Sequence, residues 1–250
     1  AAAARRGRPG LDVVIDLASA AWMWLDFLGA AVLALAATVL ARPTSRRRVV
    51  RAIAARGLAI AGIELECTGQ DVLADGGRGG VYVCNHASYV DWLVLVAALP
   101  VHARFVAKRE LARRRPLRWF LARMGVHFVE RVEVRARTAD AAALARLMAE
   151  GQCLVMFPEG TFGRAPGLRP FHLGAFMAAA RAGVPVVPVG VSGTRSALRD
   201  GSWMPRRGRV GVHIDAPLRP TGTGWSDAVR LRDDARACIA RHCGEPLARR

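Results

Sequence analysis

The stretch VCNHASYVDWLVLVAALP, residues 83–100, carries four polar residues in the first half of an otherwise apolar run. They are Asn85, His86, Ser88 and Asp91. Burying an imidazole and a carboxylate is unfavourable unless they find partners. These polar groups therefore either satisfy one another for structural reasons or are held here to do chemistry.

The spacing of His86 and Asp91 decides how the chain folds at this point. On one continuous helix, a separation of five residues would place the two side chains about 140° apart. A strand over residues 81–84 and a turn over residues 85–87 instead let His86 fold back onto the next helix. The pattern predicts Ser88 as the helix N-cap and Asp91 as the third helical residue, accepting a hydrogen bond from one imidazole nitrogen. The other nitrogen would then be free as a base.

A simpler interpretation of Ser88 and Asp91 stays open at this stage. The pattern S-x-x-D is close to a capping box, and for Asp91 alone capping is the better explanation. His86 has no capping role. It also lies beside the expected C-terminal end of a parallel strand, where open α/β sheets bind ligands, and this favours chemistry.

Strands alternate with helices along the rest of the chain, which predicts an α/β fold with a mostly parallel sheet flanked by helices. Continuous apolar runs bounded by Gly and Pro indicate strands that are buried on both faces. The predicted strands are residues 58–67, 81–84, 101–107, 126–130, 153–157, 186–191 and 210–214. The predicted helices are residues 89–99, 117–124, 138–150 and 227–243, and residues 71–80 and 219–224 are predicted loops.

An apolar segment, residues 17–40, precedes this domain and is long enough to cross a hydrocarbon core of about 30 Å. Asp26 near its centre is costly for a lipid-exposed span. Arginines flank both ends, so the positive-inside rule gives no orientation. The pattern favours a helix or hairpin lying in one leaflet, with a true span or a buried core helix as alternatives. We therefore predict a membrane-associated helical segment over residues 1–54 and a catalytic domain over residues 55–250.

The composition is basic and apolar: 250 residues, 52% hydrophobic, mean hydropathy +0.20 and a formal net charge of +17. Such a charge attracts anionic surfaces, either membrane headgroups or nucleic acid. The arginines occur in short runs without interleaved aromatic residues, which disfavours nucleic acid as a partner. The five cysteines have no C-x-x-C spacing, which disfavours a disulfide framework or a cysteine-based zinc site. The first residues lack an initiator Met, which is compatible with a piece of a longer polypeptide.

Two further stretches carry charge where strands are predicted to end. FPEGTFGR, residues 157–164, would deliver Glu159 at a strand terminus, and Gly160 and Thr161 allow a turn whose N–H groups could hold an anion. Lys108, the only lysine, follows another strand and could reach a phosphate. In both cases an ordinary solvated turn is the alternative. VPVVPVG, residues 184–190, has two prolines around an apolar strand, which suits an edge or wall position.

Together these stretches resemble the glycerophospholipid acyltransferases of the lysophosphatidic acid acyltransferase type. The family's NH-x4-D block is matched by Asn85, His86 and Asp91. Its other blocks are matched by FVAKREL (residues 105–111), FPEGT (157–161) and VPVVPVG (184–190). All four occur in the family's order, over roughly residues 55–220.

The resemblance implies a reaction and a set of roles. His86 would be the general base for the hydroxyl of a lysophospholipid, with 1-acyl-sn-glycerol-3-phosphate as the expected acceptor, and Asp91 would orient it. The oxygen would attack the thioester of acyl-CoA or acyl-carrier protein directly, without a cofactor or metal. A site at the cytoplasmic face of the cell membrane would suit these substrates, with the protein peripheral or monotopic. The expected substrate-binding residues are Asn85, Lys108, Glu159, Gly160, Thr161 and Arg164.

The chain departs from the family pattern at two positions. Phe162 stands where an arginine is common after EGT, and His172 takes the basic position of the later F-K-x-G pattern. Arg164 or Arg169 could supply the missing charge, because a loop can re-aim a long guanidinium. The acceptor headgroup could therefore be a different one, such as another lysophospholipid or an amino-acid lipid.

Overall fold

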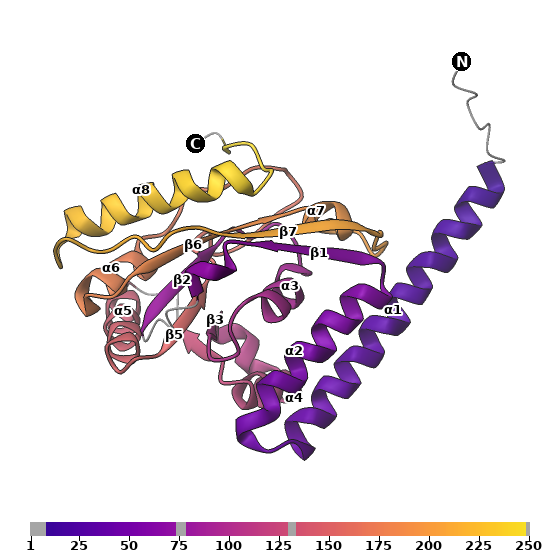
Figure 1. Ribbon diagram of the computed structural model, residues 1–250, viewed down its shortest axis with the longest axis horizontal. Coiled ribbons are helices and arrows are strands. Elements are labelled where there is room, and N and C mark those ends of the chain that lie inside the picture. Colours follow the sequence, from indigo (N-terminus) through magenta and orange to yellow (C-terminus); the bar gives the residue numbers. More distant parts are fainter. Residues whose placement is uncertain (1–8, 74–78, 130–133, 249–250) are drawn as a thin grey trace.

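Among the residues that the structure describes, 9–73, 79–129 and 134–248, seven strands form one mixed β-sheet (Figure 1). In this computed structural model the strand order is β1-β7-β6-β2-β5-β3-β4. The run β6-β2-β5-β3-β4 is parallel, β7 is antiparallel to β6, and β1 is parallel to β7. The bounds are β1 Ile63–Thr68, β2 Gly80–Cys84, β3 Arg104–Lys108, β4 His127–Val129, β5 Cys153–Met156, β6 Val186–Ser192 and β7 Gly208–Ile214. The predicted mostly parallel α/β sheet is confirmed.

Helices cover both faces of this sheet. Figure 1 shows α8 along one face and α2 and α3 on the opposite face. The helices are α1 Pro9–Leu40, α2 Pro43–Ile60, α3 Asp91–Ala98, α4 Arg115–Arg123, α5 Val134–Ala149, α6 Gly174–Ala182, α7 Thr194–Ala197 and α8 Trp225–His242. Short 3₁₀ turns are η1 Gln70–Leu73 and η2 Arg109–Arg113. The loop predicted over residues 71–80 falls partly outside the described residues, as does residue 130 of the strand predicted over 126–130.

Alternation along the strands separates two apolar cores. In β2 every residue is buried. Tyr82 and Cys84 face the core under α2 and α3, while Val81 and Val83 face the core under α5, α6 and α8. Each fully buried valine contributes about 1.5–3 kcal/mol, so the sheet holds the two helical layers together.

The N-terminal helices α1 and α2 pack against each other as an antiparallel pair (Figure 1). Met23 of α1 is fully buried and packs in the same core as Ala54 and Leu58 of α2. Most other large apolar side chains of α1 are exposed, and residues 14–40 are long and apolar enough to cross a membrane by length and composition alone. The helix α2 runs across the predicted domain boundary at residues 54–55.

Two sequence predictions about the strands are wrong. The strand predicted over residues 58–67 begins only at Ile63, because Leu58 continues the buried helical stripe of Val50 and Ala54. The strand β6, predicted at an edge or wall and not in the middle of a ladder, lies between β2 and β7. Pro188 lies opposite Asp215, just beyond the end of β7, and its carbonyl accepts from Asp215 N (2.9 Å). The N–H that proline lacks would point to the same side, past the last residue of β7, so the paired part of the strand loses no hydrogen bond.

Candidate active site

The sheet changes its direction of connection between the adjacent parallel strands β2 and β5. From β2 the chain crosses through α3 on one face, and from β5 it crosses through α6 on the other face. Such a switch point leaves an opening at the carboxyl ends of the strands, where open α/β sheets bind ligands. His86 follows β2 and Glu159 follows β5, so both lie at this opening.

His86 and Asp91 form the pair that their spacing predicts. Nδ1 of His86 lies 2.8 Å from Oδ2 of Asp91, which fixes Nδ1 as the protonated nitrogen. The same Oδ2 also accepts from the backbone N–H groups of Ala87 (2.7 Å) and Ser88 (2.9 Å). The Asp91 carboxylate is fully buried and the His86 side chain is 14% exposed. The geometry leaves Nε2 of His86 as the nitrogen that can take up a proton.

Helix α3 begins differently from the prediction. Asp91 is its first residue and Val90 its N-cap, with no side-chain capping bond. The hydroxyl of Ser88 instead donates to the carbonyl of Leu198 (2.6 Å) and accepts from Val90 N (3.2 Å). The predicted N-cap role of Ser88 is therefore wrong. Its hydroxyl ties the turn after β2 to Leu198, more than a hundred residues away.

Asn85 holds the turn from the other side. Its side-chain amide donates to Val191 O (2.8 Å) and accepts from Val191 N (2.7 Å), so the side chain extends the pairing of β2 with β6. Asn85 is buried, and both of its polar groups are engaged. These bonds give Asn85 a positioning role in the turn, and its predicted contact with substrate stays a prediction.

Glu159 is a second buried link across the site. Oε1 accepts from the backbone N–H of His86 (2.7 Å) and Oε2 from that of Arg169 (2.8 Å). Its exposure is only 4%, so the alternative of a solvated turn residue is wrong. Burial raises the pKa of Glu159 to about 7, although the two backbone hydrogen bonds act to lower it. Its carboxylate joins the turn after β2 to the far end of the loop after β5.

A C-terminal clasp holds that loop in place. Arg195 of α7 pairs with Glu245 (2.6 Å) and donates to the carbonyl of Gly163 (2.7 Å). Glu245 also accepts from Gly167 N (2.6 Å), and the next residues exchange backbone bonds with Leu168. We use the name C-terminal clasp for Arg195, Glu245 and these bonds. It fixes the loop that carries Gly160, Thr161 and Arg164.

Aromatic rings surround His86, and the sequence analysis did not predict these contacts. Phe157 stacks on the imidazole, with centroids 4.2 Å apart and planes at 20°. Phe162 contacts it from another side at 4.3 Å, and Tyr89 packs edge-on against Phe162. Phe162, which stands where the resemblance leads us to expect an arginine, is thus in direct contact with His86. The sequence signal for this contact is weak: Phe162 lies two residues after Gly160, in a predicted turn.

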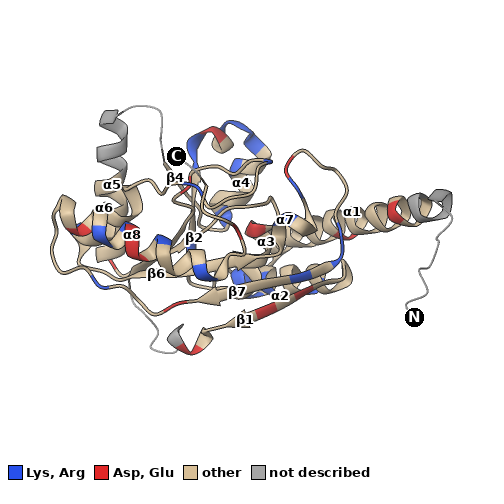
Figure 2. Cartoon of the chain, turned by 90° about the horizontal axis from the view of Figure 1, so that it is seen from above, with Lys and Arg blue, Asp and Glu red and all other residues tan. Residues whose placement is uncertain are grey.

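The remaining predicted substrate-binding residues lie at the end of β3 and in the loop after β5. Lys108 ends β3, which is two strands from β2 and so about 10 Å away by backbone spacing. Thr161 and Arg164 are exposed in the loop after β5, and Gly160 has a positive φ of 78°. Beyond Lys108, arginines of η2 and α4 line a basic depression, and Figure 2 shows blue segments gathered around α4.

An apolar cavity of about 290 Å³ opens between α1, α2, α3 and α4. Its lining includes Phe27 and Ala34 of α1, Ile53 of α2 and Trp92 of α3. Tyr89, which packs against Phe162 beside His86, also lines it, so one wall of the cavity lies two ring contacts from His86. The apolar wall predicted over residues 184–189 is not part of this lining.

The sequence of this chain is similar to those of known proteins. A family model described as "Acyltransferase" matches residues 64–192. A chloroplastic 1-acyl-sn-glycerol-3-phosphate acyltransferase of Brassica napus is 34% identical over 161 residues, which is 64% of this chain and 45% of the relative. The human beta enzyme of the same name is 32% identical over 157 residues, covering 62% and 56%. The chain spans about half the length of the curated relatives that it matches.

The fold has a solved counterpart. The crystal structure of the 1-acyl-sn-glycerophosphate acyltransferase PlsC from Thermotoga maritima superposes with a TM-score of 0.71 at 20% identity. The match covers 91% of this chain and 96% of that one, so it includes most of the N-terminal helical pair as well as the sheet.

Proposed function

The chain belongs to the acyltransferase family, and we propose that it transfers a fatty acyl group from a thioester donor to a lysophospholipid hydroxyl. The proposed acceptor is 1-acyl-sn-glycerol-3-phosphate, and the product is phosphatidic acid. The observation that carries the proposal is the His86–Asp91 pair at the switch point of the sheet. The names of the relatives support the same acceptor.

The proposed reaction needs one base. Nε2 of His86 takes the proton from the acceptor hydroxyl as its oxygen attacks the thioester carbonyl. The Asp91 carboxylate stabilises the imidazolium that forms. When the tetrahedral intermediate collapses, the carbon–sulfur bond breaks, the new ester forms, and the thiol takes the proton back from His86. The acyl group passes directly to the acceptor, with no acyl-enzyme and no cofactor.

The surroundings of the pair suit two amphipathic substrates. The apolar cavity offers room for an acyl chain, since ligand sites are mostly apolar with a few placed polar groups. Lys108, Arg164, Arg169 and the N–H groups of the Gly160–Thr161 turn are proposed to hold the acceptor's phosphate. The basic depression on η2 and α4 is proposed to receive the anionic part of acyl-CoA or acyl-carrier protein.

The membrane is the proposed place of action. The exposed apolar side of α1 suits burial in one leaflet, and the net charge of +17 suits an anionic surface. A peripheral or monotopic seat on the cytoplasmic face would give the site access to a lysolipid in the bilayer and to a soluble donor.

A second candidate acceptor follows from Phe162. Its ring contacts His86 where a cationic side chain would otherwise meet a phosphate. A lysolipid with a different headgroup is the alternative that this contact favours.

The test compares acyl transfer by the wild type and His86→Ala. Radiolabelled acyl-CoA and acyl-carrier protein are offered with lysophosphatidate and a panel of other lysolipids, and products are identified by mass spectrometry. We expect phosphatidic acid from the wild type and a rate lower by about 10²–10⁴-fold in the variant. His102→Ala, at an exposed histidine, is the matched control and should keep the wild-type rate.

Unchanged transfer by His86→Ala would remove the assigned base. Wild-type transfer to another lysolipid, but not to lysophosphatidate, would replace the first acceptor by the second.

A further inference from the structure

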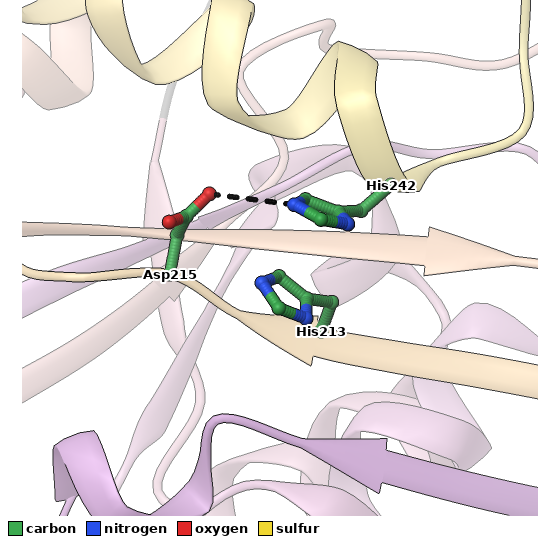
Figure 3. Close-up of side chains that lie close together, drawn as sticks. All are labelled: His213, Asp215 and His242. Atoms are coloured by element: carbon green, nitrogen blue, oxygen red, sulfur yellow. Dashed lines mark ion pairs between the residues drawn. The ribbon is translucent and has the colours of Figure 1, made fainter.

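Two histidines and an aspartate meet on the face of the sheet covered by α8 (Figure 3). His213 lies in β7, Asp215 directly follows β7, and His242 ends α8. One ligand atom of each lies within 4.8 Å of those of the other two. The proposed acyl transfer uses none of these side chains. We call them the His-Asp-His cluster.

The rings are arranged so that both can face one ion. The imidazoles of His213 and His242 stack with centroids 3.6 Å apart and planes at 22°. Nε2 of His242 lies 3.9 Å from Oδ2 of Asp215. Figure 3 shows one nitrogen of each ring on the side of Asp215.

Thr68 orients one of the two rings. Its hydroxyl oxygen lies 2.7 Å from Nδ1 of His213, across the β1–β7 pairing that sets these residues opposite each other. A histidine that binds a metal usually donates its second N–H to such a partner, which fixes the tautomer. With Nδ1–H given to Thr68, the Nε2 lone pair of His213 points toward the cluster.

A glycine makes room for the second ring. Gly190 of β6 pairs with His213, and a Cβ at position 190 would lie 2.8 Å from Cβ of His242. The missing side chain lets the end of α8 approach the sheet at this point. The close approach of His242 to His213 thus depends on the glycine at position 190.

We propose that His213, Asp215 and His242 bind a divalent transition-metal ion, with Zn²⁺ as the type ion. Two imidazole nitrogens and a carboxylate oxygen are the donor set of many zinc sites, and imidazole suits this class of metal. Tetrahedral Zn²⁺ with bonds of about 2.0–2.2 Å places its ligands about 3.5 Å apart. The cluster must therefore close by about 1 Å, which its partly exposed side chains permit, and water takes the fourth position.

Arg241 competes with the metal for Asp215. Its Nη2 donates to Oδ2 of Asp215 at 3.2 Å, and its side chain is 58% exposed. Metal binding requires this guanidinium to turn away into solvent, where it has room. A neutral residue at position 241 should therefore strengthen metal binding.

The ion would join the end of α8 to β7. Only Cys243 and Gly244 separate His242 from Glu245 of the C-terminal clasp. Metal binding should therefore stabilise the segment that leads into the clasp. This inference does not depend on the acceptor or donor of the proposed reaction.

The experiment titrates Zn²⁺ into metal-stripped, tag-free protein with thiols alkylated, using calorimetry and thermal melting. We expect one Zn²⁺ per chain and a higher melting temperature. His213→Ala and His242→Ala should each weaken binding by at least about 10-fold, and Thr68→Val by about 10–100-fold. Arg241→Gln should tighten it, and the exposed-site control His102→Ala should leave it unchanged.

Several outcomes would overturn the site. One is the absence of saturable binding at 100-fold excess Zn²⁺ over protein. Another is Zn²⁺ binding that survives both histidine substitutions. Melting curves without metal check that the variants fold. If His213→Ala does not fold, two other variants test the site: His242→Ala at the helix end, and Gly190→Ala, which pushes His242 away. Unchanged Zn²⁺ binding in both of them contradicts the proposal.

Discussion

Asp91 concentrates three hydrogen bonds on one oxygen. Oδ2 accepts from His86 and from two backbone N–H groups, while the buried Oδ1 has no partner among the described residues. Asp91→Asn keeps the shape but removes the charge that stabilises the imidazolium. We expect kcat to fall by about 10²–10⁴-fold with little change in the acceptor KM. Steady-state kinetics measure this, with the exposed Asp233→Asn as control.

An unchanged kcat in Asp91→Asn, with a lower melting temperature, would reduce Asp91 to a structural role in the turn.

Glu159 should make stability depend on pH. Its pKa is raised by burial from 4.5 to about 7. Between these values the folded state binds more protons than the unfolded state. The contribution of Glu159 is therefore fully present below about pH 4.5, declines as pH rises, and is lost above about pH 7. The change is about 3 kcal/mol in the free energy of unfolding at most.

Glu159→Gln should remove this decline. The NH2 group of the glutamine would face the N–H of Arg169, so two donors would lie together without an acceptor. We therefore also expect a pH-independent loss of about 1–3 kcal/mol in the free energy of unfolding. Urea unfolding of both proteins from pH 4.5 to pH 8 gives the difference curve. Parallel curves would show that Glu159 is ionised throughout this range.

The part of the site that is formed by residues close together in the chain could be predicted from the sequence. His86 and Asp91 are five residues apart, so a strand, a turn and a helix were enough to predict that they meet. Glu159 finds the N–H of His86 from 73 residues away, and Asn85 finds Val191 from 106. Such partners depend on strand order, which the spacing of motifs does not determine.

At the scale of elements, the C-terminal clasp should be energetically coupled. The Arg195 and Glu245 side chains are only 14% and 10% exposed, so removing one leaves the other as a poorly solvated charge. We expect a loss of about 3 kcal/mol from either Arg195→Ala or Glu245→Ala. The double variant should lose much less than the sum of the two.

The exposed pair Arg209 and Glu64 is the matched control. Its side chains are 76% and 69% exposed, so the coupling should be below about 1 kcal/mol. Urea unfolding of both double-mutant cycles measures the two couplings. Equal couplings would show that the C-terminal clasp contributes no more than a surface pair.

Elements with clear periodicity were predicted well, and those without it were not. The helix α5 and the buried strands β5 and β6 were found near their bounds. The helix α6 was missed because its face against the sheet is mostly alanine, so no stripe of large apolar residues marks it. The antiparallel β7 could not be inferred, since strand direction is set by the connection through α7 and its following loop.

At the scale of the whole molecule, the exposed apolar surface of α1 and the positive net charge both favour a membrane as the partner. Leu25 and Leu28 of α1 are 64% and 62% exposed, far more than a helix packed in a core allows. Residues 17–40, predicted as a helix or a hairpin, form one continuous helix within α1, and α2 packs against it. Oδ2 of Asp26 in α1 lies beside Gly57 of α2, so this carboxylate is turned toward the helix pair, where Oδ2 is buried without a hydrogen-bond partner among the described residues.

This pairing predicts how the protein binds vesicles. On vesicles with anionic lipid, salt should weaken binding by screening the arginines. Binding should not vanish, because the apolar side of α1 stays inserted. Leu25→Asp combined with Leu28→Asp should lower the partition coefficient by at least about 10-fold, since a carboxylate resists entry into hydrocarbon.

Vesicle sedimentation at two salt concentrations separates the two contributions. Trp225→Asp, at the start of α8 on the other face of the sheet, is the control, because Trp225 is as exposed as the two leucines. It should bind vesicles as the wild type does. If both variants weaken binding equally, α1 is not the inserted element. If high salt abolishes wild-type binding, the protein is held by charge alone and the apolar side of α1 does not enter the bilayer.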